Sequence, residues 1–272
     1  AIGATAALAP TAAADIPGTS KKERKFSLFG GKPEVHKGKR RAYNDWYRGE
    51  TLSRVAMPMG GMGAGMICLE GTGALTHVSL RNSPEMFNEP MMFAAICVKG
   101  KENVARVLEG PVPDWKKYGT PGSANGLGER SYGLPRFREA AFLARFPFGA
   151  IELADPKVPL KVRITGWSPF VAGDPDSASL PVIGLEYKFT NTSKSAVEAV
   201  FSFNAKNFMH RGDGKRAVKA AKGGFILHQA GTDKEPHNEG AFSATVNDPE
   251  VHLNLAWFRG GWFDPLTVLW KT

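Results

Sequence analysis

The stretch LKVRIT, Leu160 to Thr165, alternates apolar and polar residues without a break. A period of two places one face of a β-strand in a core and the other face in water. The same alternation recurs in three further stretches, LEYKF (Leu185–Phe189), VFSFN (Val200–Asn204) and VHLNLAW (Val251–Trp257). Half-buried strands of this kind are typical of antiparallel sheets, whose outer faces can stay wet.

Turn signals separate these short strands. Ala64–Glu70 and Ala74–Leu80 flank Gly71-Thr72-Gly73, which predicts a hairpin. The chain has 31 glycines and 19 prolines, and no segment shows a sustained helical stripe. We therefore expect an all-β fold, a large antiparallel β-sandwich over residues 43–272. Its final strands are expected beyond Thr272, because the apolar run Val268-Leu269-Trp270 stops abruptly.

The glycine run MPMGGMGAGMI, Met57 to Ile67, invites comparison with a phosphate-binding loop. Gly60 and Gly65 have the spacing of such a loop, but Met66 and Ile67 stand where lysine and Ser/Thr are needed. A dinucleotide loop also follows a strand and opens a helix, and here a hairpin follows. The run is better explained by glycines that let two backbones approach closely.

The N-terminal residues differ from the rest in composition. AIGATAALAPTAAAD resembles the end of an export signal with small residues for cleavage around Ala12 to Ala14, so residues 1–14 are expected to be its remnant. Residues 15–42 are expected to be a basic flexible linker, because residues 21–41 hold nine Lys/Arg against two Glu. The remaining 26 basic and 24 acidic residues almost balance, which argues against nucleic-acid binding by the folded part. We expect an exported, periplasmic or extracellular protein without a membrane span, in which residues 1–41 are separable from the fold.

No constellation for metal or nucleophilic catalysis stands out. The six histidines are scattered without ligand spacing, and no serine lies in a nucleophile motif. No metal or cofactor is therefore expected. Cys68 and Cys97 lie in apolar strand-like runs, which favours buried free thiols, with a disulfide as the alternative in an exported protein.

One segment combines polar groups with apolar bulk, SLRNSPEMFNEPMMF from Ser79 to Phe93. Its candidate binding residues are Arg81, Glu85, Asn88 and Glu89. These groups suit either sugar hydroxyls or the bracing of a buried loop, and bracing is favoured. The two glutamates also invite comparison with a glycosidase acid/base pair, but a retaining enzyme needs carboxyls about 5–5.5 Å apart, which spacing alone cannot supply.

A long excursion, Gly110 to Pro135, is rich in glycine and proline yet contains Trp115, Tyr118 and Tyr132. Such aromatic residues argue against plain disorder, so we expect an ordered loop packed on another surface.

The order of several stretches resembles the N-terminal domain of glycoside hydrolase family 116, with the closest likeness to bacterial members. The resemblance is carried by MPMGGMGAGMI, LEGTGALTHVSLRNSPE, FNEPMMFAAI, ARVLEGPVPDWKKYG, GLPRF, ARFPFG, ITGWSPF, LEYKFTN and AWFRGGWFDPLT. The family also includes the animal non-lysosomal β-glucosylceramidase. The resemblance implies a retaining β-glucosidase in which this sandwich packs on a C-terminal (α/α)6 barrel that bears both catalytic carboxylates.

That barrel would lie beyond Thr272, so no catalytic residue is assigned to this chain. The resemblance implies that the β-glucoside substrate and the barrel of the same protein are its partners. Trp115 and Tyr118, together with Trp262 and Asp264 from the stretch Trp257–Asp264, are candidates for the interdomain face or the rim of the sugar pocket. A stand-alone carbohydrate-binding sandwich and a structural or adhesion module remain the alternatives.

Overall fold

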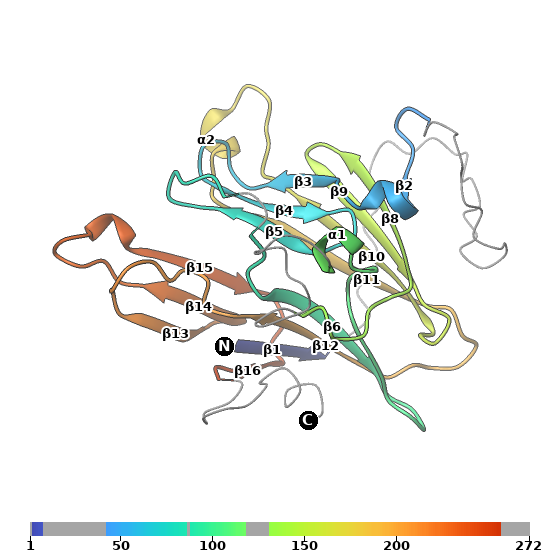
Figure 1. Cartoon of the computed structure of the whole chain (residues 1–272). Coiled ribbons are helices and arrows are strands. Elements are labelled where there is room, and N and C mark those ends of the chain that lie inside the picture. The colour runs from blue at the N-terminus through green and yellow to red at the C-terminus, as the bar shows by residue number, and fades with distance from the viewer. Residues whose placement is uncertain (1, 8–41, 86–87, 118–130, 257–272) are drawn as a thin grey trace.

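The computed structural model describes residues 2–7, 42–85, 88–117 and 131–256. Two five-stranded sheets form its main layers (Figure 1). The first has the order β16-β1-β12-β6-β7, with bounds Val251–Asn254, Ile2–Ala7, Ala199–Ala205, Met92–Val98 and Val104–Val107. The second has the order β11-β10-β9-β8-β2, with bounds Gly184–Asn191, Leu160–Trp167, Phe148–Ala154, Glu139–Arg145 and Tyr47–Arg48.

Two smaller sheets accompany these layers. One contains β13 (Arg216–Ala221), β14 (Gly224–Gln229) and β15 (Gly240–Thr245), and the other contains β3 (Ala56–Met59), β4 (Met66–Glu70) and β5 (Leu75–Ser79). The helices are single turns: α1 (Asp114–Lys117), α2 (Pro175–Ala178), and the 3-10 turns η1 (Gly49–Leu52) and η2 (Pro236–Asn238). All paired strands of the four sheets run antiparallel, so the predicted all-β antiparallel sandwich is confirmed.

The alternation that predicted strands determines which side chains enter the core. In β10, Leu160, Val162 and Ile164 are buried, while Arg163 between them is exposed. The fully buried interior continues through β8 and β9 of the same sheet and into β14 of a smaller sheet, with Phe142, Ile151, Leu153 and Phe225 among its largest members. Burying each such side chain contributes about 1.5–3 kcal/mol relative to leaving it in water.

The predicted hairpin is formed by β4 and β5. The Gly73 amide donates to the Glu70 carbonyl over 2.8 Å, and Gly73 has a φ of 94°, which a glycine adopts without strain. The small sheet that contains this hairpin packs on the second five-stranded sheet, where Met59 and Leu69 lie over Gly166.

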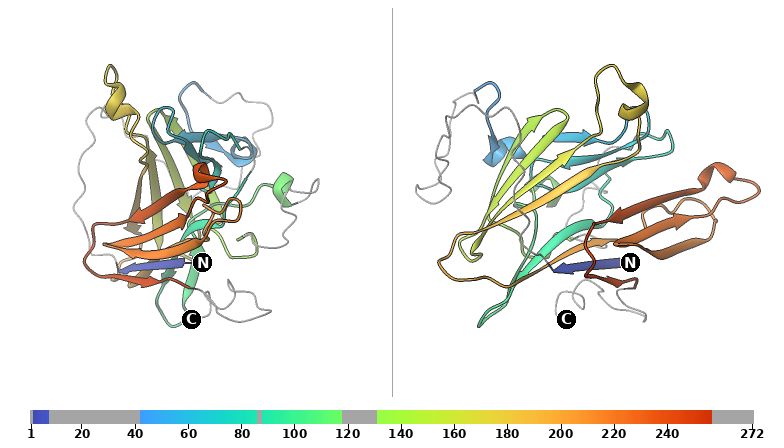
Figure 2. Two further views of the ribbon diagram at one scale, coloured as in Figure 1. Left: turned by 90° about the vertical axis from the view of Figure 1, so that its left-hand side faces the viewer. Right: turned by 180° about the vertical axis from the view of Figure 1, so that it is seen from behind.

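The two main layers converge where β11 passes into β12. They diverge toward the side that carries α2 and η2, as Figure 2 shows from two further directions. The sandwich is therefore open on one side, and that opening matters for the site below.

The first residues differ from expectation. Residues 1–41 were expected to be separable from the fold, but Ile2–Ala7 form β1, which pairs with β12 on one side and β16 on the other. Strand pairing uses backbone groups, so an alanine-rich segment can complete a sheet without a large apolar side chain. The remainder of the expected export remnant and basic linker, residues 8–41, lies outside the described residues.

Within the described part of the chain, no helix combines the length and the hydropathy that crossing a bilayer requires.

Both cysteines are free thiols in the structure. Cys68 is buried in β4, and Cys97 is half-buried in β6 of a different sheet. Burial, together with the nearby Glu70 carboxylate, raises the pKa of the Cys68 thiol to about 11.

We expect a maleimide to label Cys97 well before Cys68 in the native protein. At pH 8, a thiol with that pKa is ionised in roughly one molecule in a thousand, and the thiolate is the reactive form. Mass spectrometry of the labelled peptides measures the two rates. A Cys97→Ser variant is the control, because it should take up almost no label until urea is added. Equal native labelling of both thiols would contradict the burial of Cys68.

Candidate functional site

A buried ion cluster joins the end of the β4 strand to α1 and to the segment before β6. The Lys116 ammonium donates to the Glu70 carboxylate over 2.5 Å and also to the Glu89 carboxylate. The Tyr132 hydroxyl donates to the other oxygen of Glu89, and the Thr76 hydroxyl donates to Glu70 over 3.0 Å. Lys116 is only 4% exposed, so one buried cation holds two carboxylates.

A second buried pair lies beside this cluster. The Arg136 Nε donates to the Glu109 carboxylate over 3.1 Å, and its Nη1 donates to the carbonyls of Ser131 and Leu134. Burial raises the pKa of the Glu109 carboxyl, and the Arg136 guanidinium acts in the opposite direction. Arg136 thus fixes the returning end of the Gly110–Pro135 excursion to the segment that follows β7.

The space around these charges leaves no room for a sugar. A cavity of about 20 Å³ lies between Glu89, Glu109 and Tyr132. A single water needs roughly 10–15 Å³ of such space. Because each carboxylate is already bonded to a cation or a hydroxyl, the cluster fastens the excursion to the sandwich and offers no free acid or base.

Asn88 and Glu85 support a loop. The Asn88 side chain accepts from the Val78 amide over 2.6 Å and donates to the Val78 carbonyl over 2.9 Å. These are the two backbone hydrogen bonds that a residue of a paired strand would make with Val78. It also donates to the exposed Glu85 carboxylate over 3.0 Å. Glu85 and Glu89 therefore belong to separate hydrogen-bonded groups.

Arg81 lies at a sharp turn after β5. Arg81 and Asn82 have φ values of 55° and 52°, and a β-bridge joins Leu80 to Ser83, as in the reverse turns that close hairpins. The Arg81 Nη2 donates to the Met209 carbonyl over 3.1 Å, while its buried Nε has no protein partner.

The Trp115 side chain is half-buried and not fully exposed to solvent. Its indole nitrogen donates to the Ser53 carbonyl over 2.6 Å, and the Arg54 guanidinium lies 5.0 Å from its ring centre. Of the excursion's aromatic residues within the described segments, Trp115 and Tyr132 are both half-buried and both make internal contacts of this kind. Tyr118, Trp262 and Asp264 lie outside the described residues.

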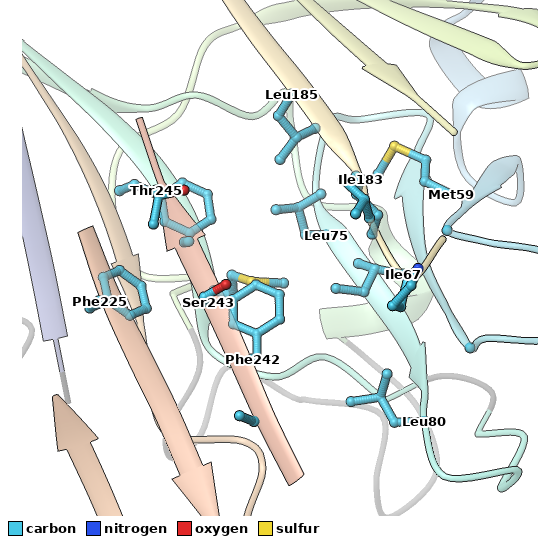
Figure 3. A pocket seen from close by; sticks show the side chains of 18 of the residues that line it. Met59, Ile67, Leu75, Leu80, Ile183, Leu185, Phe225, Phe242, Ser243 and Thr245 are labelled. Carbon is cyan, nitrogen blue, oxygen red and sulfur yellow. The ribbon is translucent and has the colours of Figure 1, made fainter. Parts of the chain in front are cut away.

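An apolar groove occupies the open side of the sandwich (Figure 3). Its volume is about 760 Å³, and Leu75, Leu185 and Phe242 project into it from different sheets. Arg81 is the one charged residue among the described residues that line it. A sugar site needs several convergent polar groups, so this lining suits apolar packing better than saccharide binding.

Comparison with known families decides the relationship. The family model described as beta-glucosidase 2, glycosyl-hydrolase family 116, N-terminal domain, matches residues 56–267. The chain belongs to this family. No curated protein sequence matches it. An N-terminal domain of a glycoside hydrolase implies a C-terminal catalytic domain.

The glycine run of this family 116 domain is clamped against the loop that contains α2. A Cβ added to Gly61 would lie less than 3.0 Å from the carbonyl oxygens of Ser179 and Leu180. The Met62 amide donates to the Ala178 carbonyl over 2.8 Å, and the Gly60 amide donates to the Ser168 hydroxyl over 3.1 Å. The glycines permit close backbone packing, as the sequence indicated.

Four charged residues of the family 116 domain escaped the sequence analysis: Glu70, Glu109, Lys116 and Arg136. Glu70 and Glu109 each directly follow apolar residues, in MICLE and VLE, and a lone carboxylate at such a position is a signal for a buried pair. Lys116 carried no comparable signal. Lys117 beside it is the same residue type, yet its side chain is 40% exposed, so the sequence could not show which of the two lysines is buried.

Proposed function

We propose that this chain is the non-catalytic N-terminal part of a retaining β-glucosidase, and that it packs on and shapes the active site of a C-terminal (α/α)6 barrel. The observation that most supports the non-catalytic role is that both oxygens of the Glu89 carboxylate accept hydrogen bonds within the domain. A retaining mechanism needs a carboxylate nucleophile and a separate acid/base, both able to reach the glycosidic bond. Glu89 is held by Lys116 and Tyr132 beside a cavity of about 20 Å³, which admits no sugar ring.

We expect residues 1–272 alone to hydrolyse no aryl β-glucoside, because the catalytic carboxylates lie outside the chain. Release of the aryl group is measured with the purified chain and with the same chain joined to its catalytic domain. Only the joined protein should be active. Turnover by the chain alone that is lost in Glu85→Gln or Glu89→Gln would refute the proposed division of labour.

A second candidate function, carbohydrate binding by the isolated sandwich, is favoured by one feature. Trp167 and Phe148 are exposed and lie opposite one another in neighbouring strands, as a sugar-stacking platform requires. Titration with β-linked glucose oligosaccharides, monitored by tryptophan fluorescence, separates the two functions.

Export and a glucosylceramide-like substrate are further parts of this proposal. Export rests on the alanine-rich start, although cleavage around Ala12 to Ala14 would remove β1 from its sheet. Amino-terminal sequencing of the protein recovered from the periplasm or the medium tests export. Assays with glucosylceramide and aryl β-glucosides on the joined protein test the substrate.

A further inference from the structure

One end of the second five-stranded sheet gathers exposed apolar side chains. We call it the aromatic end and define it by six residues: Met62, Phe146, Phe148, Trp167, Phe170 and Val182. They come from the β3–β4 connection, the β8–β9 turn, the first residue of β9, the last residue of β10 and the connection that carries α2. Of the large apolar side chains that are exposed in the described residues, only Tyr43 and Val246 lie outside these segments.

The side chains at this end are held in place. The Phe146 and Phe170 rings meet edge to face with centroids 5.0 Å apart. Trp167 lies opposite Phe148 on one side and Gly184 on the other, and its indole covers the space that a Gly184 side chain would occupy. The close packing of Gly61 on Leu180 fixes the neighbouring loops. A rigid apolar surface loses little conformational entropy when it binds.

The exposure of these rings is unusual for a surface without a partner. Phe146 is 63% exposed, Phe148 45% and Phe170 38%. Contiguous apolar patches larger than a few hundred Å² are rare on soluble monomers and mark interaction sites.

Two of the charged side chains next to these rings in the sequence, Arg145 and Asp174, already make hydrogen bonds within the domain. Arg145 donates to the Asn44 side chain over 3.1 Å, and Asp174 caps α2 through Ser177. An apolar centre with a polar rim is the composition of a protein interface. The mixed signs of Arg145, Asp174 and Asp176 give no preference for an anionic membrane.

The aromatic end is continuous with the apolar groove. Val182 belongs to both, and the glycine run borders the groove at Gly60 and Gly65. Three of the stretches that carry the family resemblance also meet here, namely MPMGGMGAGMI, ARFPFG and ITGWSPF.

We infer that the aromatic end is the surface on which the catalytic domain of the same protein docks, with its contact extending into the mouth of the groove. This inference rests on the proposed function. The occupant is a protein surface with few charges and exposed apolar side chains. Domain contacts of this kind bury on the order of 600–1,500 Å², which is enough to cover these rings.

Hydroxyl-radical footprinting of the full-length protein tests this surface without any substitution. Phe146, Phe148 and Phe170 should be labelled about tenfold more slowly than their exposure in this domain requires, because an interface removes them from water. The exposed His210, in the β12–β13 connection, and the exposed His237, in η2, lie outside the aromatic end and serve as internal references. Labelling of the rings in proportion to their exposure overturns the inference. Protection that appears only with phosphatidylcholine vesicles, with cello-oligosaccharides or with self-association also overturns it.

A double substitution in the full-length protein provides the second measurement. Phe146→Asp with Phe170→Asp should split a single thermal transition into two and reduce β-glucoside hydrolysis about tenfold or more, because two anchors of the contact become charged. The control is Ala220→Asp on the exposed face of β13, which should change neither. One transition with full activity in the double variant contradicts the docking surface. Hydrolysis by the catalytic domain without this sandwich contradicts the proposed function itself, so the two failures are distinguishable.

Discussion

Replacing Lys116 with methionine is expected to lower the free energy of unfolding by about 3–5 kcal/mol, because it leaves buried carboxylates without their cation. Lys116 is 4% exposed and bonds to both Glu70 and Glu89. Methionine keeps most of the side-chain volume, so the loss reports on charge rather than on a cavity. Urea unfolding followed by tryptophan fluorescence measures the change.

The control for this prediction is Lys117→Met in the same turn of α1. Lys117 pairs with Asp114 at the surface, and surface pairs of this kind contribute about 0–1 kcal/mol. Adding Glu70→Gln and Glu89→Gln to Lys116→Met should recover part of the lost stability, since no buried charge is then unpaired. If Lys116→Met were no more destabilising than Lys117→Met, the buried cluster would not exist in solution.

Replacing Gly61 with alanine is expected to cost roughly 3 kcal/mol, because overpacking against fixed atoms forces backbone shifts. The obstacle is the backbone of Ser179 and Leu180, which cannot rotate away as a side chain can. The same shift should disturb the aromatic end and weaken docking of the catalytic domain.

Gly133→Ala is the matched control for Gly61→Ala. A Cβ at Gly133 would meet nothing within 4 Å, so thermal unfolding should barely change. Circular dichroism melts of both variants measure the difference. An unchanged melting temperature in Gly61→Ala would show that the glycine run is not packed against the connection that carries α2.

Several features of this protein could be predicted from the sequence because they depend on local patterns. Strict alternation in Leu160–Thr165 specified a half-buried strand, and β10 has that burial. Gly71-Thr72-Gly73 specified the β4–β5 hairpin. The missing lysine after Gly65 separated the glycine run from phosphate loops. A period of two and a turn are properties of neighbouring residues, so they can be recognised without knowing the rest of the fold.

Other features depended on which distant residues the tertiary structure brings together. Glu70, Glu89, Lys116 and Tyr132 form one cluster although they are spread over more than sixty positions, and no local period relates them. Trp115, a candidate for the interdomain face or the rim of the sugar pocket, donates to the Ser53 carbonyl, a contact that its sequence neighbours do not reveal.

The aromatic end likewise escaped the sequence analysis. FPF and WSPF do not differ in composition from core aromatics, and exposure is decided by where the strands end. Ile2–Ala7 join a sheet because their backbone pairs with β12 on one side and β16 on the other. The residue types of the segment do not predict this pairing. By itself the sequence determined the strands with strict alternation, such as β10, and the β4–β5 hairpin of this family 116 domain. The tertiary structure alone decided which charges are buried together and which rings face water, because both are set by contacts between residues far apart in the chain.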